Sequence, residues 1–149
     1  MKIQKKQTGF TLVELITVVS MLALLTIFVA REMGQSSNGM KVKLVEKVLI
    51  SNVPNAIAAH RLENNDNCLA GLDEDTLGAV GVPNLTPWGT AWNASYAIAT
   101  RTVTVLYDLT GTSNIDTVGA ALVLRLAGNS AFSADPTYGS DVITATYPC

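Results

Sequence analysis

The sequence lacks most of the side-chain combinations on which enzymes depend. Its 149 residues include one histidine, His60, and two cysteines, Cys68 and Cys149. We find no Gly-x-Ser-x-Gly nucleophile motif, no phosphate-binding glycine loop and no cysteines and histidines at metal-ligand spacing. A lone histidine is more typical of a packing or surface residue than of a metal ligand or a catalytic base. We therefore expect no enzymatic activity, no cofactor and no metal.

Three short segments raise binding functions, but each signal is weak. Residues 73–75, Asp-Glu-Asp, lack the alternating oxygen-ligand spacing of a calcium loop, which favours a solvated turn. Trp88 and Trp92 could form an adhesive surface, although packing in a core is the favoured use. Residues 93–95, Asn-Ala-Ser, match an N-glycosylation triplet, which alone predicts nothing.

Charged residues are scarce, at 15% of the chain, and 48% of residues are hydrophobic. The apolar excess is concentrated in residues 10–30, where Glu14 is the only ionisable side chain. At ~1.5 Å per residue, a helix of this length spans the ~30 Å hydrocarbon core of a bilayer. Lys2, Lys5 and Lys6 precede the run and predict a cytoplasmic N-terminus. We interpret these lysines as a topology signal, in preference to a nucleic-acid patch.

A conventional secretory signal peptide also has a basic start followed by an apolar run. Here the run exceeds the usual ~7–15 residues and contains a carboxylate, Glu14, near its start. The residues before Arg31 are not a small-x-small cleavage site, and a small residue, Gly9, stands before the run instead. These features argue against a conventional signal peptide.

The segment QTGFTLVELITVVSML resembles the N-terminal signature of type IV prepilins and of the related pseudopilins of type II secretion. In this resemblance Gly9 is the last leader residue, Phe10 the first mature residue and Glu14 the fifth. It implies cleavage between Gly9 and Phe10, and N-methylation of Phe10, by the membrane-embedded prepilin peptidase. The implied location is a single-pass inner-membrane protein before assembly and an extracellular pilus afterwards.

The resemblance also implies the partners of the chain. They are further copies of itself in a homopolymer, or other pilins in a mixed pilus, together with the inner-membrane assembly platform of the pilus machinery. The membrane is a partner only before assembly, and we predict no nucleic-acid partner.

Glu14 has a chemical role that follows from its surroundings. An ionised carboxylate in hydrocarbon is costly unless it is paired. Cleavage converts the Phe10 nitrogen into a cationic amine, ~6 Å from Glu14 along a helix axis. The pair could form within one chain or between Glu14 and the Phe10 amine of a neighbouring subunit, which would set the register of assembly. A glutamate merely tolerated near a helix N-terminus is the alternative.

The resemblance and the periodicity together predict an α+β, type IV pilin-like fold. A long N-terminal helix packs on a small antiparallel β-sheet head that is closed by a disulfide. We divide the chain into a cleaved leader (1–9), a transmembrane and assembly helix (10–33), an amphipathic second half of the helix (34–67) and a globular head (68–149). Weak helix formers at 34–39 predict a weak point, where the helix would fray or stretch once neighbouring subunits supply other contacts.

The second half of the helix has a clear apolar face. We expect a kink at Pro54 and an end within residues 63–67. The face predicted to pack against the head consists of Val45, Val48, Leu49, Val53, Ala56 and Ile57.

In the head, residues 91–99 and 102–109 predict adjacent antiparallel strands, and residues 142–147 a third strand. Residues 115–126 have helical spacing, although 120–126 could instead form a buried strand. We expect residues 68–88 to be mostly irregular.

Cys68 and Cys149 would both enter an oxidising compartment in the predicted topology, which favours a disulfide between them. Two unpaired thiols are the alternative. Type IV pilins commonly have a disulfide at a C-terminal cysteine, so the resemblance agrees.

Three functional classes fit these observations. A type IV pilus subunit, serving adhesion, motility or DNA uptake, is favoured by the disulfide-closed head. A pseudopilin is the alternative, and the Trp88-Gly89 turn gives it some support, because principal pseudopilins often have a similar turn. An unrelated membrane-anchored binding domain is the third class.

Overall fold

The computed structural model describes residues 12–65, 67–68 and 71–149, without the side chains of residues 27–37. The chain divides into two units, Met1–Ser37 and Asn38–Cys149. The elements, in chain order, are α1 (Leu12–Lys47), the π-helix η1 (Val48–Asn52), α2 (Val53–Glu63), α3 (Glu74–Ala79), β1 (Asn93–Ala97), β2 (Thr102–Asp108), α4 (Ile115–Leu126), β3 (Ala134–Gly139) and β4 (Val142–Pro148).

Helix α1 continues without interruption through residues 34–39, where the sequence predicted a weak point. The boundary between the two units lies within this stretch, after Ser37. The predicted loss of helix concerns the chain among its neighbours in an assembly, and for that state it stays a prediction.

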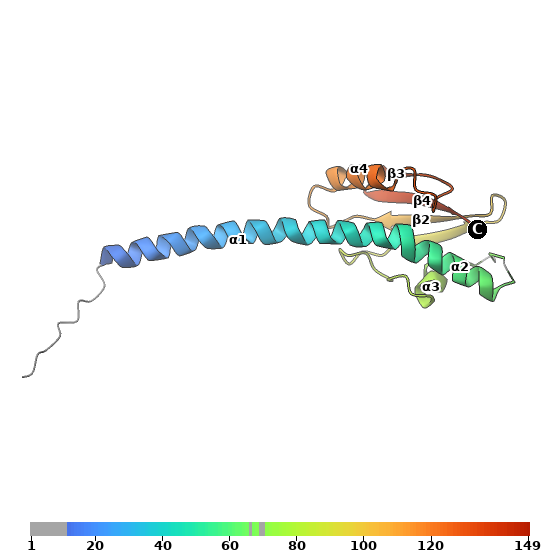
Figure 1. Ribbon diagram of the computed structural model, residues 1–149, viewed down its shortest axis with the longest axis horizontal. Helices are drawn as coiled ribbons and strands as arrows, with labels where there is room; N and C mark the ends of the chain where they lie inside the picture. The colour runs from blue at the N-terminus through green and yellow to red at the C-terminus, as the bar shows by residue number, and fades with distance from the viewer. Residues whose placement is uncertain (1–11, 66, 69–70) are drawn as a thin grey trace, which may run out of the picture. The chain divides into compact units, whose positions relative to one another are not determined.

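The kink predicted at Pro54 is accompanied by the π-helical turn η1, which ends at Asn52, two residues before the proline. Proline has no N–H, and its ring clashes with the carbonyl of the preceding turn, so regular α-helical bonding cannot continue through it. At the end of η1, the Val53 N–H donates to the Val48 carbonyl, five residues earlier. Figure 1 shows the helix axis changing direction between the end of α1 and α2. Helix α2 then ends at Glu63, as predicted.

The second unit is built on a four-stranded antiparallel sheet with the strand order β1-β2-β4-β3. The three predicted strands are confirmed as β1, β2 and β4. Strands β1 and β2 pair from Ala97↔Thr102 onward, so their predicted antiparallel adjacency is also confirmed.

The edge strand β3 was not predicted. Its sequence, ADPTYG, contains Pro136, which cannot donate to a ladder and is tolerated at a sheet edge. The pairing with β4 shifts register between Ala134 and Thr137, at the position of this proline.

One face of the sheet packs against the helices. All six residues of the predicted helix face are buried, which confirms the amphipathic periodicity of residues 45–57. Facing them on the two central strands are the buried side chains of Val103, Val105, Tyr107, Ile143, Ala145 and Tyr147.

Two further helices lie at opposite edges of the sheet, with α4 beside β3 and α3 near β1 (Figure 1). Helix α4 spans the predicted residues, so the alternative strand at 120–126 is wrong. Gly119 lets α4 approach the sheet closely, since a Cβ there would overlap the Tyr138 ring.

Helix α3 corrects one expectation, because residues 73–75 form the start of a helix and not a solvated turn. The described part of residues 68–88 is otherwise mostly irregular, as predicted. Asp73 is the N-cap of α3, and its carboxylate accepts a 2.9 Å hydrogen bond from the Thr76 N–H. The Thr76 hydroxyl accepts from the Asp73 N–H in return, at 2.8 Å, which completes a capping box. The bond from the Thr76 N–H, together with a 3.0 Å bond that the Thr76 hydroxyl donates to the same carboxylate, lowers the pKa of Asp73.

Candidate functional site

The candidate processing and assembly site is at the start of the chain. Gly9 and Phe10, between which cleavage is predicted, lie outside the described residues. Glu14 lies in the first turn of α1 as the structure describes it, and its side chain is exposed. The proposed pairing of Glu14 with the Phe10 amine therefore stays a prediction.

The helix surface around Glu14 is apolar and exposed. From Leu12 to Leu25, the exposed fractions of the large apolar side chains lie between 53% at Val18 and 75% at Leu12. Soluble monomers rarely expose contiguous apolar patches of this extent, and such patches mark contacts with a membrane or another protein.

Three hydroxyl side chains in this segment donate hydrogen bonds to backbone carbonyls of their own helix. Thr17 donates to the Val13 carbonyl at 2.9 Å, Ser20 to the Ile16 carbonyl at 2.8 Å, and Thr26 to the Ala23 carbonyl at 2.8 Å. Sequence reasoning missed this feature, although serine and threonine in an apolar helix commonly bond to the preceding turn. The hydroxyls of Thr17, Ser20 and Thr26 therefore make little hydrogen-bonding demand on the surroundings of this segment.

The predicted transmembrane segment, residues 10–33, extends beyond the described residues at its start, and its side chains from residue 27 onward are not described. Within the part of the chain that the structure describes, no helix combines the length and the hydropathy needed to cross a membrane.

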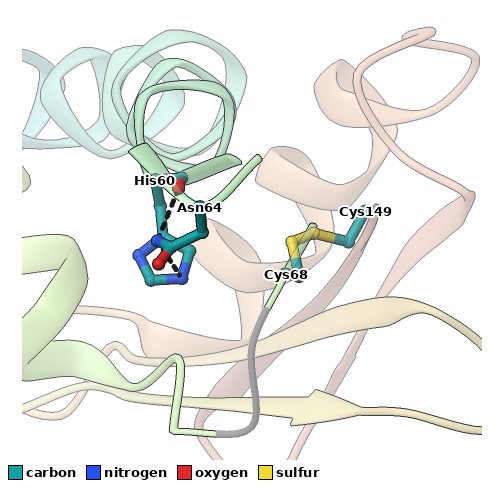
Figure 2. Close-up of a disulfide and its surroundings, with 4 residues drawn as sticks. All are labelled: His60, Asn64, Cys68 and Cys149. Carbon is teal, nitrogen blue, oxygen red and sulfur yellow. Dashed lines mark hydrogen bonds between the residues drawn. A yellow bond between two sulfur atoms is a disulfide. The ribbon is translucent and has the colours of Figure 1, made fainter. Parts of the chain in front are cut away.

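The predicted disulfide is present and joins Cys68, just after α2, to Cys149, just after β4 (Figure 2). The two Cα atoms are 6.0 Å apart, and 81 positions separate the cysteines in the sequence. The Cys149 N–H donates to the Arg101 carbonyl at 2.9 Å, which holds the end of β4 beside the β1–β2 turn. The bridge thus fastens the end of the helical segment to the C-terminal strand.

His60 lies on α2 and is partly buried, and its contact is a local one with Asn64 of the same helical segment (Figure 2). The Asn64 amide donates to the His60 carbonyl at 2.8 Å and lies 3.4 Å from the His60 Nε2 atom. No group of three or more histidine, cysteine, aspartate or glutamate side chains among the described residues could hold a metal ion.

The two tryptophans differ in their surroundings. Trp92 is buried, and its indole N–H donates to the Pro83 carbonyl at 2.7 Å, which confirms core packing for this residue. Trp88 is only partly buried, and the Lys41 ammonium lies 6.0 Å from its ring centroid. Trp88 is therefore placed beside the end of α1.

The comparisons with known proteins bear on the N-terminal segment alone. No curated protein and no solved structure is detectably similar to the chain. Residues 4–30 match the family model of the prokaryotic N-terminal methylation motif, and this type IV prepilin-like signature indicates a pilin-like or pseudopilin protein.

Proposed function

We propose that this chain is a structural, non-enzymatic subunit of a type IV pilus. In this proposal it is cleaved after Gly9, N-methylated at Phe10 and polymerised through residues 10–33. The observation that supports it best is the exposed apolar surface of α1, which carries Glu14 inside the segment that matches the methylation motif. The covalently closed head of residues 68–149 suits a protein that is exported to an oxidising compartment.

Before assembly, residues 10–33 hold the chain in the inner membrane, with Lys2, Lys5 and Lys6 on the cytoplasmic side. The prepilin peptidase cuts there and exposes the Phe10 amine. In the filament, apolar helices bundle together, and the Glu14 carboxylate of one subunit meets the amine of a neighbour. Because a buried carboxylate without a counter-charge is costly, uncut or misregistered subunits are excluded.

The decisive measurement is the intact mass of the chain recovered from sheared filaments. We expect the mass of residues 10–149, increased by the net CH2 of one N-methylation and decreased by the two hydrogens lost in the disulfide. Filaments that lack the chain, or that contain it with its leader, would contradict the proposal.

A pair of variants tests the pairing of Glu14. Glu14→Ala should be cleaved normally and yet assemble poorly, because its subunits lack the carboxylate that neutralises the neighbouring amine. Glu14→Asp keeps the charge and serves as the matched control, with partial assembly. Wild-type filament yield from Glu14→Ala would show that the carboxylate has no pairing role.

A pseudopilin of type II secretion is the second candidate, favoured by the Trp88-Gly89 turn. Gly89 has φ +86°, which suits glycine, and its N–H donates to the Thr86 carbonyl at 2.9 Å. Deletion of the gene separates the candidates. Loss of long surface filaments supports a pilin, whereas intact filaments with failed export of secreted enzymes support a pseudopilin.

A further inference from the structure

A groove in the second unit runs between the end of α1, with η1, and the loop that precedes β1. Its volume is about 270 Å³. Leu44, Val48, Pro83 and Leu85 give it apolar walls, and Lys47 adds a cationic side chain. Leu44 and Leu85 are 50% and 55% exposed, so the groove is an apolar surface in contact with solvent in the single chain.

Tyr107 of β2 also lines this groove. Its side chain is only 1% exposed, and its hydroxyl has no hydrogen-bond partner among the described residues. An unsatisfied buried hydroxyl is destabilising. Because this hydroxyl is buried, Lys47 and Asn52 are the polar side chains that the groove offers to an occupant.

The chain carries a complementary feature at the end of α2. Leu62 is 82% exposed, more than any other large apolar side chain in the described residues, and the exposed Glu63 follows it. An apolar side chain next to a carboxylate matches a groove with apolar walls and a lysine. The other exposed leucine of similar degree in this unit, Leu124 at 79%, is followed by Arg125, which would meet Lys47 with like charge.

We propose that Leu62 and Glu63 of one copy dock into this groove of a second copy. In this contact the Leu62 side chain packs against Leu44 and Leu85, and the Glu63 carboxylate pairs with the Lys47 ammonium. The contact joins two different surfaces of the same chain, so it is heterologous and propagates into an open filament unless it closes as a ring. It rests on the proposed function, because it names the head-to-head contact of the same filament.

The sequence positions set the geometry of this contact. Lys47 and Leu62 lie on one helical path, about four turns apart, or ~22 Å at ~1.5 Å per residue. With parallel helices, the two copies that share this contact are therefore displaced by roughly this distance along the axis. They are a different pair of copies from those joined through Glu14 and the Phe10 amine, whose displacement is ~6 Å. The contact adds to the apolar packing of the N-terminal helices without replacing it.

Charge reversal in full-length chains tests the pairing. Lys47→Glu and Glu63→Lys should each lower the yield of sheared filaments by roughly tenfold, since each places like charges together. The double variant Lys47→Glu/Glu63→Lys should restore most of the yield. Wild-type yields from both single variants, or a double variant no better than either single one, would overturn the proposal.

Cysteine crosslinking gives a second measurement that does not depend on filament yield. Leu62→Cys with Leu85→Cys should form crosslinked ladders between subunits in filaments or membrane-held oligomers, and Leu124→Cys with Leu85→Cys is the matched control. Ladders from the control pair alone, or from neither pair in intact filaments, would overturn the docking. Absence of the wild-type chain from filaments would instead overturn the proposed function.

Discussion

The Tyr147 hydroxyl donates a 2.9 Å hydrogen bond to the Leu49 carbonyl, and the two residues are 98 positions apart in the sequence. In the π-helical pattern of η1, the Leu49 carbonyl would accept from the residue five positions later, which is Pro54 and has no N–H. Tyr147 therefore supplies the donor that the proline cannot. The bond ties the C-terminal strand to the irregular turn of the long helix.

Replacement of Tyr147 by phenylalanine should lower the free energy of unfolding by about 1–3 kcal/mol, because the buried Leu49 carbonyl loses its donor. Urea denaturation of the full-length chain in detergent measures the change. Tyr107→Phe is the matched control, since Tyr107 is equally buried and its hydroxyl has no partner among the described residues. Its unfolding free energy should change little or rise, and equal losses in both variants would contradict the role of the bond.

The same tyrosines predict instability in alkali. Burial raises the pKa of Tyr107 from 10.0 to about 12 and also raises the pKa of Tyr147. Because the folded state favours the neutral hydroxyl, its stabilisation is complete below pH 10 and is lost as the pH rises through the folded pKa. Unfolding free energies measured between about pH 8 and about pH 11 should fall above pH 10, less steeply in Tyr107→Phe. A flat profile across this range would contradict the burial effect.

Two glycines in helices should respond in opposite ways to replacement by alanine. A Cβ at Gly119 would overlap the Tyr138 ring, whose hydroxyl donates to the Asp116 carboxylate at 3.0 Å. Gly119→Ala should therefore cost about 1–3 kcal/mol through overpacking, despite the better helix propensity of alanine. A Cβ at Gly39 meets no atom within 4 Å, so Gly39→Ala should stabilise by up to ~1 kcal/mol. Thermal denaturation measures both, and a stabilised Gly119→Ala variant would contradict the close packing of α4.

The elements that sequence reasoning predicted are those with a strong local pattern. The apolar periodicity from Val45 to Ile57 specified the buried helix face, and β-branched residues specified β2 and β4. Strand β3 escaped prediction because Asp135 and Pro136 disfavour a strand, and pairing with β4 overrides that preference. Helix α3 is only six residues long, and its one readable signal was the pair Asp73 and Thr76 of the capping box.

The same distinction between local and long-range patterns applies to the functional residues. Gly9, Phe10 and Glu14 could be named from the sequence because their spacing forms a linear motif, which residues 4–30 match. The bond from Tyr147 to Leu49 could not be named, because no local pattern links residues so distant in the chain. Pro54 predicts that one backbone carbonyl in the preceding turn lacks its N–H donor, but only the fold shows which side chain supplies a donor instead.

Reduction of the disulfide should destabilise the head without changing its helices and strands. The bridge closes a loop between positions separated by 81 residues, and native disulfides of this kind contribute about 2–5 kcal/mol. Its loss also releases the end of α2 from Cys149, the residue after β4, whose N–H donates to the Arg101 carbonyl. Urea denaturation with and without reductant measures the effect. The Cys68→Ser/Cys149→Ser variant is the control, because its free energy of unfolding should not depend on reductant. An oxidised wild-type chain no more stable than this variant would contradict a stabilising role for the bridge.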